Sequence, residues 1–404
     1  MLEAIKTGFD NWFRITPKDV LYDRTLLWVY VSLLMIGLVA VSSASIPVSW
    51  RLHNEPFHFA IMDGAYILVS LCIFAFFIQQ PMSRWEKYNI GFFIISVILL
   101  ALVLPFGKEI NGAKRWLSIG SVTFQASELA KLAVISYFAS FYVRRYDELR
   151  RAWHSGWRPL AVVFVFILIL NFQSDLGSMV IIFLIAFGML FVMGAQAAQF
   201  IGLIALGGTG FAIYVLSSEY RMKRWTAYRD PFVDVYGDGF QLANSQMAFG
   251  QGEIWGRGLG NSIQKLEYLP EAHTDFITAV IGEEFGLIGT LFLLFLFIFL
   301  VLRAIHISKE SLQMEKRFNG YFSCGIAIWF LLQGAINLGG ASGLIPSKGL
   351  TFPFVSYGGS SMVILSIGKN WLHPCEGKLS LSGRFCEKIY KIDRFLFPKK
   401  YKFL

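Results

Sequence analysis

The run LFLLFLFIFLVL at residues 291–302 is an unbroken series of twelve apolar side chains. It ends a predominantly apolar stretch, residues 276–302, and a helix needs about 20 such residues to cross the hydrocarbon core of a bilayer. A strand of a membrane barrel needs only about 10 residues. Because the stretch is too long for a barrel strand, it predicts a transmembrane helix.

Nine more apolar runs lie along the chain. They cover residues 25–46, 61–79, 89–106, 127–143, 159–173, 177–193, 197–218, 320–341 and 354–372. The runs 159–173 and 177–193 are short and are separated by Asp175 and Gly177, so they fit either a tight hairpin or one broken helix. The sequence therefore predicts an all-α, polytopic integral membrane protein of about ten transmembrane helices.

The composition agrees with this class. Of the 404 residues, 55% are hydrophobic and 16% are charged. Charged residues make up about a quarter of a soluble domain. These fractions exclude a soluble enzyme and a disordered chain, and the four cysteines have no spacing typical of a disulfide framework or a zinc site.

The basic residues predict how the bundle is oriented. The net charge is +9, and 24 of the 36 Lys and Arg residues fall on one side of the membrane if the N-terminus is cytoplasmic. Basic residues are enriched in cytoplasmic loops, so the charge reports topology rather than binding to nucleic acid. We expect a cytoplasmic segment at residues 1–24, a membrane domain at 25–372 and a basic cytoplasmic tail at 373–404.

One loop of this topology, residues 219–275, is large and extracytoplasmic. It is too long for a passive connection between helices. It is rich in glycine and in aromatic residues such as Trp225 and Trp255. We expect short amphipathic helices and turns that lie on the outer face of the membrane domain.

Three ionisable residues fall within or between spans, where charges are costly and are often functional. Glu128 and Lys131 are three residues apart and share one helix face, so they fit either an ion pair that anchors packing or part of a polar cavity. Asp175 fits a cap for the following helix, with Gly177 allowing close approach of backbones. It also fits a functional carboxylate.

Three of the eleven basic residues that this topology places outside, against the positive-inside bias, are candidate site residues. Lys114 and Arg115 precede the span at 127–143, where they fit a solvated turn or a contact to an anionic head group. Lys348 lies in the Gly-, Pro- and Ser-rich segment between the last two spans. It fits a side chain that reaches up to the membrane surface, or a second contact to phosphate or carbohydrate.

The stretch YLPEAHTDF at residues 268–276 ends the large loop, where the span at 276–302 begins. Glu271 and Asp275 suit a helix start, because acidic side chains stabilise the first turn. The alternative is a carboxylate at the membrane–water boundary, whose pKa is raised by desolvation and which acts as a general base. His273 fits a structural hydrogen bond or a titrating group. No set of residues has the spacing of a metal site or of a Ser/His/Asp triad.

The order and spacing of these stretches resemble the SEDS family (shape, elongation, division and sporulation), most closely its division branch. The motifs that carry the resemblance are YDRT at 22–25, GAKRW at 112–116, FQASE at 124–128 with Lys131, QSDLG at 173–177, GFQ at 239–241, MAFGQGEIWG at 247–256, KLEYLPEAHTD at 265–275 and PFVSYGGSS at 353–361. The family usually has proline where Ala126 and Ser174 stand, which puts the local helix geometry in question.

The resemblance implies a peptidoglycan glycosyltransferase that polymerises lipid II at the outer face of the cytoplasmic membrane. Asp275 matches the family's catalytic aspartate, which would deprotonate the 4-hydroxyl of the acceptor GlcNAc for an inverting attack on C1 of the donor MurNAc. The cations Arg115, Lys131 and Lys348 would neutralise the undecaprenyl pyrophosphate leaving group, with Glu128 positioning Lys131. Further residues expected to contact pyrophosphate or sugar are Lys114, Asp175, Glu271, His273 and Ser356. A divalent cation, Mg²⁺ or Mn²⁺, could assist, although the sequence shows no site for it.

The resemblance also implies partners and a location. The partners would be a class B penicillin-binding protein that crosslinks the new strands and other division proteins, at the septum in the inner membrane. A lipid II flippase and a division scaffold also fit a ten-span bundle with internal charges. A flippase is disfavoured because Arg115, Lys348 and loop 219–275 all lie outside, and a scaffold needs no carboxylate at a cleft.

Overall fold

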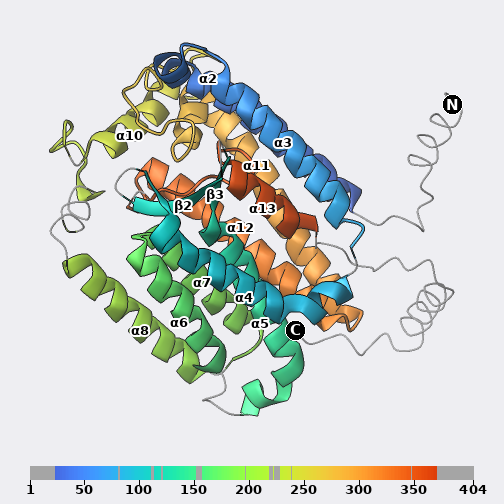
Figure 1. Ribbon diagram of the computed structural model, residues 1–404. Coiled ribbons are helices and arrows are strands. Elements are labelled where there is room, and N and C mark those ends of the chain that lie inside the picture. Colours follow the sequence, from blue (N-terminus) through green and yellow to red (C-terminus); the bar gives the residue numbers. More distant parts are fainter. Residues whose placement is uncertain are drawn as a thin grey trace, which may run out of the picture.

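The computed structural model describes residues 23–80, 82–110, 113–119, 122–151, 157–195, 197–217, 222, 228–237, 239–346 and 348–370. These residues form a bundle of helices packed side by side (Figure 1). A helix lies at each of the ten predicted spans: α2 (Arg24–His53), α3 (His58–Phe77), α4 (Met82–Phe106), α5 (Ala126–Arg151), α6 (Trp157–Phe172), α7 (Leu176–Val192), α8 (Ala197–Leu216), α11 (Ile277–Gln313), α12 (Arg317–Ser342) and α13 (Gly359–Asn370). The predicted helical membrane class is confirmed. The segment before residue 23 and the tail after residue 370 lie outside the described residues.

The exterior of the bundle suits a lipid environment. Five helices of the described chain, α2, α3, α4, α11 and α12, are long and apolar enough to cross a membrane, and shorter apolar helices lie at Arg158–Phe172, Leu176–Val192, Gln199–Gly210 and Gly359–Gly368. Large apolar side chains such as Phe172, Ile201 and Phe295 are exposed on the outside of these helices. Apolar surface on this scale is unfavourable in water and is typical of contact with lipid chains. The chain is therefore a multi-pass membrane protein.

Helices α5 and α12 lie at the centre of the bundle (Figure 1). Their core side chains are fully buried, among them Phe138 of α5 and Trp329 of α12. Gly325 of α12 is needed for this packing, because a Cβ there would lie 2.6 Å from Cγ2 of Ile135 in α5. The central helices therefore approach more closely than side chains would otherwise allow.

Helices α6 and α7 form a tight hairpin, which decides between the two alternatives for residues 159–193. Ser174 takes a left-handed conformation (φ 54°) in the turn. Asp175 caps α7, because its side chain accepts a hydrogen bond of 3.2 Å from the backbone N–H of Ser178. This is the helix-capping role that the sequence allowed for Asp175.

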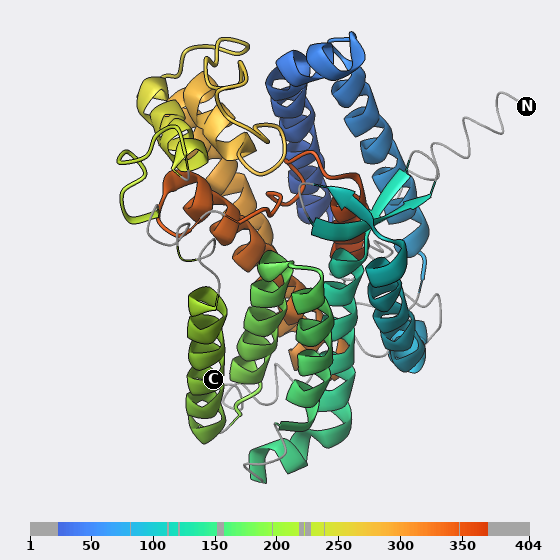
Figure 2. The same cartoon turned by 60° about the vertical axis from the view of Figure 1, so that its left-hand side comes forward.

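A three-stranded antiparallel sheet lies between α4 and α5, and the sequence did not predict it. It consists of β1 (Lys108–Ile110), β2 (Ala113–Ile119) and β3 (Val122–Gln125), with Trp116 opposite Gln125 and Leu117 opposite Phe124. The sequence pattern predicts only a turn here, because its apolar residues are too few to give a period. The sheet, the loop around α10 and the segment between α12 and α13 lie toward the same end of the bundle (Figure 2).

The large loop contains a helix, α10 (Phe240–Gly252), followed by turns that pack on α11. Helix α11 breaks at Gly286, whose φ of 66° and ψ of −163° are open mainly to glycine. The chain after α10 runs along this break: the N–H of Arg257 donates to the carbonyl of Glu283 at 3.0 Å, and the N–H of Leu287 donates to the carbonyl of Glu253 at 2.9 Å. Helix α10 and the turns that follow it are thus fixed to α11 on both sides of its break.

Candidate functional site

Asp275 lies in the turn that leads into α11. The carbonyl of Glu271 accepts hydrogen bonds from the backbone N–H of Asp275 at 3.1 Å and of Phe276 at 3.3 Å. The carbonyl of Asp275 accepts a bond of 2.8 Å from the side-chain amide of Asn337 in α12. The backbone of Asp275 is therefore fixed from both sides, while its side chain is half-buried.

Two other segments meet the Asp275 carboxylate. A Cβ at Gly349 would lie 3.2 Å from Oδ2 of Asp275 and 4.0 Å from a guanidinium nitrogen of Arg115. Arg115 comes from β2, and its guanidinium donates a hydrogen bond of 2.6 Å to the carbonyl of Ser174 in the α6–α7 turn. The sheet, this turn, the start of α11 and the segment after α12 thus converge on one point.

The surroundings of Asp275 make it a candidate proton acceptor. Burial raises the pKa of Asp275 to about 7, the nearby Glu271 carboxylate adds to the rise, and the Arg115 guanidinium opposes it. A carboxyl group with a pKa near the working pH is suited to general base catalysis. Asp275 is the described residue that best fits this role outside the membrane spans.

Two of the three lysines predicted for the site, Lys348 and Lys114, differ in their positions. Lys348 is half-buried and directly precedes Gly349, so that it belongs to the segment that meets Asp275. Lys114 is exposed on β2, in register with Glu109 of β1. Successive side chains of a strand point to opposite faces, so Lys114 and Arg115 face opposite ways.

Asp175 lies in the α6–α7 turn, directly after Ser174, whose carbonyl binds Arg115. Asp175 is buried, and its Oδ2 atom has no hydrogen-bond partner within the described chain. Two residues later, Gly177 allows Leu350 to approach, because a Cβ at Gly177 would lie 3.0 Å from Cδ2 of Leu350. Asp175 therefore caps α7, and its neighbours Ser174 and Gly177 contact residues of the site.

Glu128 and Lys131 form a buried ion pair away from the surface. Lys131 Nζ lies 2.6 Å from Oε1 of Glu128, and the Lys131 side chain is fully buried. The ammonium also donates to Oε1 of Gln333 at 3.1 Å and lies 5.3 Å from the centre of the Trp329 ring. This is the packing arrangement that the sequence allowed. A direct role of Lys131 on a leaving group stays a prediction.

Three other predicted site residues have local partners. Glu271 is exposed, and one of its carboxylate oxygens accepts a bond of 2.8 Å from Thr274 Oγ1. His273 is buried among aromatic rings, 5.0 Å from Phe59 and 5.7 Å from Tyr357 between ring centres, and this burial lowers its pKa. Ser356 Oγ accepts a bond of 2.8 Å from the N–H of Phe352, which closes a turn.

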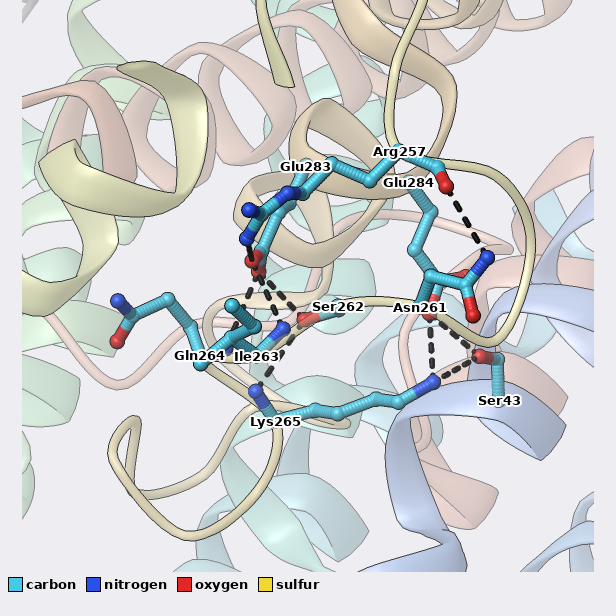
Figure 3. Close-up of polar contacts among 9 residues, drawn as sticks. All are labelled: Ser43, Arg257, Asn261, Ser262, Ile263, Gln264, Lys265, Glu283 and Glu284. Atoms are coloured by element: carbon cyan, nitrogen blue, oxygen red, sulfur yellow. Dashed lines mark hydrogen bonds and ion pairs between the residues drawn. The ribbon is translucent and has the colours of Figure 1, made fainter. Parts of the chain in front are cut away.

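Sequence reasoning missed a second group of buried charges, which fastens the loop after α10 to α11 (Figure 3). Lys265 Nζ lies 2.7 Å from Oε1 of Glu284, and the same oxygen accepts a bond of 2.6 Å from Ser43 of α2. The neighbouring Glu283 carboxylate accepts from the backbone N–H of Ile263 at 2.8 Å. The signal was present, because two adjacent glutamates inside an apolar span are unusual.

Asp63 in α3 was also missed, although it too is an acidic residue inside an apolar span. It is fully buried, and neither of its carboxylate oxygens has a hydrogen-bond partner in the described part of the chain. Among the described residues, no group of three or more His, Cys, Asp and Glu side chains could hold a metal ion. Assistance by Mg²⁺ or Mn²⁺ stays a prediction.

The chain is similar to known membrane proteins over most of its length. A family model described as "Cell cycle protein", for FtsW, RodA and SpoVE, matches residues 24–374. A protein of Haemophilus ducreyi is 58% identical over 367 residues, which are 91% of this chain and 92% of that protein. A protein of Haemophilus influenzae is 54% identical over 365 residues, 90% of this chain and 93% of that protein. Both are named "Probable peptidoglycan glycosyltransferase FtsW".

A solved structure has the same fold. It comes from work on "Structural coordination of polymerization and crosslinking by a peptidoglycan synthase complex". The two chains superpose with a TM-score of 0.72 at 27% sequence identity, over 87% of this chain and 96% of the other. The overall arrangement of the helices is thus shared with a chain from that work.

Proposed function

Because the chain belongs to the family of FtsW, RodA and SpoVE cell cycle proteins, we propose that it is a peptidoglycan glycosyltransferase with Asp275 as its general base. The substrate would be lipid II, which acts as both donor and acceptor. The observation that carries this proposal is the position of the Asp275 carboxylate, which meets Gly349 and Arg115 at one end of the bundle. This end would face the outside, where lipid-linked precursor is polymerised.

The proposed reaction is a single displacement. Asp275 takes the proton of the 4-hydroxyl of the acceptor GlcNAc, and this oxygen forms a bond to C1 of the donor MurNAc. The bond between C1 and the pyrophosphate oxygen breaks, and undecaprenyl pyrophosphate leaves with the electron pair. Attack opposite the leaving group converts the α donor into a β linkage. A raised pKa of about 7 suits Asp275 to accept a proton near neutral pH.

The leaving group carries negative charge, so the reaction requires cations near the donor. Arg115 supplies a planar guanidinium that is already oriented by its hydrogen bond to the carbonyl of Ser174. Lys348 is adjacent to Gly349 and lies in the same segment. We assign these two residues to the pyrophosphate. Lys131 is fully buried beside Glu128, and its contact with the leaving group stays a separate prediction.

The proposed setting is the septum, in the inner membrane with both termini in the cytoplasm. The proposed partners are a class B penicillin-binding protein, which would crosslink the strands, and other division proteins. The likeness to a chain of a synthase complex supports a partner of this kind.

The deciding experiment incubates the purified full-length chain with labelled lipid II, with and without the partner. Glycan polymer from the wild-type chain, and none from Asp275→Asn at equal folding and membrane level, is the expected result. Translocation of lipid II without polymer would instead show a flippase, and neither activity in the presence of the partner would favour a scaffold. Polymer made at wild-type rate by Asp275→Asn would reject the base assignment.

A further inference from the structure

Two amide side chains on α12 hold the segment that carries Lys348 and Gly349. Gln333 and Asn337 are four residues apart, so they share one face of the helix. Both are buried. Gln333 Nε2 donates to the carbonyl of Thr351 at 3.0 Å, and Asn337 Nδ2 donates to the carbonyl of Leu350 at 2.6 Å. The two amides therefore fix two consecutive peptide units of this segment.

Asn337 also holds the other side of the site. The same Nδ2 donates to the carbonyl of Asp275 at 2.8 Å, and Asn337 Oδ1 accepts a bond of 3.3 Å from Thr278 Oγ1 in the first turn of α11. One side chain thus joins the backbone of Asp275 to the backbone of Leu350. The separation between the Asp275 carboxylate and the Lys348–Gly349 segment depends on these two hydrogen bonds of Asn337.

The orientation of the Gln333 amide is set by the buried charges beneath it. Its Oε1 accepts from Lys131 Nζ at 3.1 Å and from Trp329 Nε1 at 2.8 Å. Two donors directed at one atom require that atom to be the oxygen, so the NH₂ group must point toward Thr351. Glu128 in turn holds Lys131 at 2.6 Å. The buried ion pair therefore reaches the site through Gln333.

We propose that Gln333 and Asn337 are positioning residues for glycosyl transfer, which hold the Asp275 carboxylate at a fixed separation from the segment that carries Lys348 and Gly349. This inference rests on the proposed function. It gives Glu128 and Lys131 a task that needs no contact with substrate: they keep the Gln333 amide in the orientation that binds Thr351. A misplacement of reacting groups by about 1 Å can cost about 100-fold in rate.

The first test is the kinetics of Asn337→Ala with labelled lipid II. We expect kcat to fall by about 10- to 100-fold while KM changes far less, because the altered side chain is buried. We also expect the acid limb of the pH profile to move to lower pH. A loosened turn lets water reach Asp275, and burial is the main cause of its raised pKa. Gln333→Met should change both quantities in the same directions but by less.

Ser245→Ala is the matched control. It removes another buried side-chain hydrogen bond to α12, from Ser245 Oγ to the carbonyl of Ala341 at 2.7 Å, but it does not touch the segment at 348–351. We expect kcat to stay within about two-fold of wild type, with an unmoved acid limb. If Asn337→Ala does not fold, Asn337→Leu provides a variant of similar size that lacks the NH₂ donor and adds no charge near Asp275.

Hydrogen exchange gives a readout that does not depend on activity. Peptides covering 343–357 should exchange faster in Asn337→Ala than in wild type, and at the wild-type rate in Ser245→Ala. An unchanged exchange rate in Asn337→Ala would show that the Asn337 side chain does not hold this segment in place. A loss of kcat with an unmoved acid limb and a lowered melting temperature would reduce Asn337 to a stabilising residue. A wild-type chain that makes no polymer would reject the proposed function separately.

Discussion

The Cα of Gly349 faces the carboxylate of Asp275, and a Cβ at position 349 would lie 3.2 Å from Oδ2. At this distance an added methyl group displaces the carboxylate by a few tenths of an ångström. We therefore expect Gly349→Ala to lower the kcat of lipid II polymerisation by about 10-fold, with little change in melting temperature. Gly250→Ala in α10 is the control, because a Cβ there has nothing within 4 Å. Equal rates for the two variants would show that Asp275 tolerates the displacement.

The pH dependence of polymerisation should follow the charges around Asp275. The base is the unprotonated carboxylate, so the rate should rise with pH through about 7, the value to which burial raises the pKa of Asp275. Glu271 raises this pKa and Arg115 lowers it. Glu271→Gln should therefore move the acid limb to lower pH, and Arg115→Gln should move it to higher pH. A rate profile that responds to neither substitution would mean that another group titrates.

Lys348 and a lysine of the tail provide a test of local charge. Lys348→Ala should weaken polymerisation by about 10-fold or more, because it removes a cation from the segment that meets Asp275. Lys378→Ala removes the same charge from a residue that lies outside the described part of the chain and that the sequence places in the cytoplasmic tail. Initial rates of polymerisation at several lipid II concentrations measure the effects of both substitutions. Equal effects would leave Lys348 as a residue that only reaches the membrane surface.

The sequence predicted the individual residues of the site better than their arrangement. Asp275 was found because its motif ends at the first residue of a long apolar run, and Arg115 because it lies on the side of the membrane where basic residues are scarce. Their meeting at Gly349 depends on a sheet and on a segment between α12 and α13. Strands of three to seven residues leave no periodic signal, so this convergence could not be predicted.

Two kinds of residue were missed for different reasons. Glu284 and Asp63 lie in apolar spans, so the rule that found Lys131 would have found them as well. Gln333 and Asn337 are neutral amides in a helix that contains both polar and apolar residues. The sequence around them does not indicate which backbone carbonyls they bind. Only the hydrogen bonds from their NH₂ groups reveal which backbone they hold.

Asp63 should destabilise the folded chain. It is fully buried in α3, and both carboxylate oxygens lack a hydrogen-bond partner within the described residues. Leaving a buried polar group unsatisfied costs about 1–3 kcal/mol, so Asp63→Leu should raise the melting temperature of the detergent-solubilised protein. Ser70→Ala in the same helix is the control and should raise it less, because a neutral hydroxyl is cheaper to bury. A lower melting temperature for Asp63→Leu would show that the carboxylate has a partner.

The pair Lys265–Glu284 should be strongly coupled in stability. Its atoms lie 2.7 Å apart with both side chains almost fully buried, so removing one partner leaves an uncompensated charge. Lys265→Met and Glu284→Gln should each lower the free energy of unfolding by about 3–5 kcal/mol. The double variant should lose much less than the sum of the two, because it leaves no buried charge unpaired. Thermal unfolding of the four proteins measures the coupling. Additive losses would mean that the loop after α10 is held to α11 mainly by its backbone hydrogen bonds to Glu283 and Glu253.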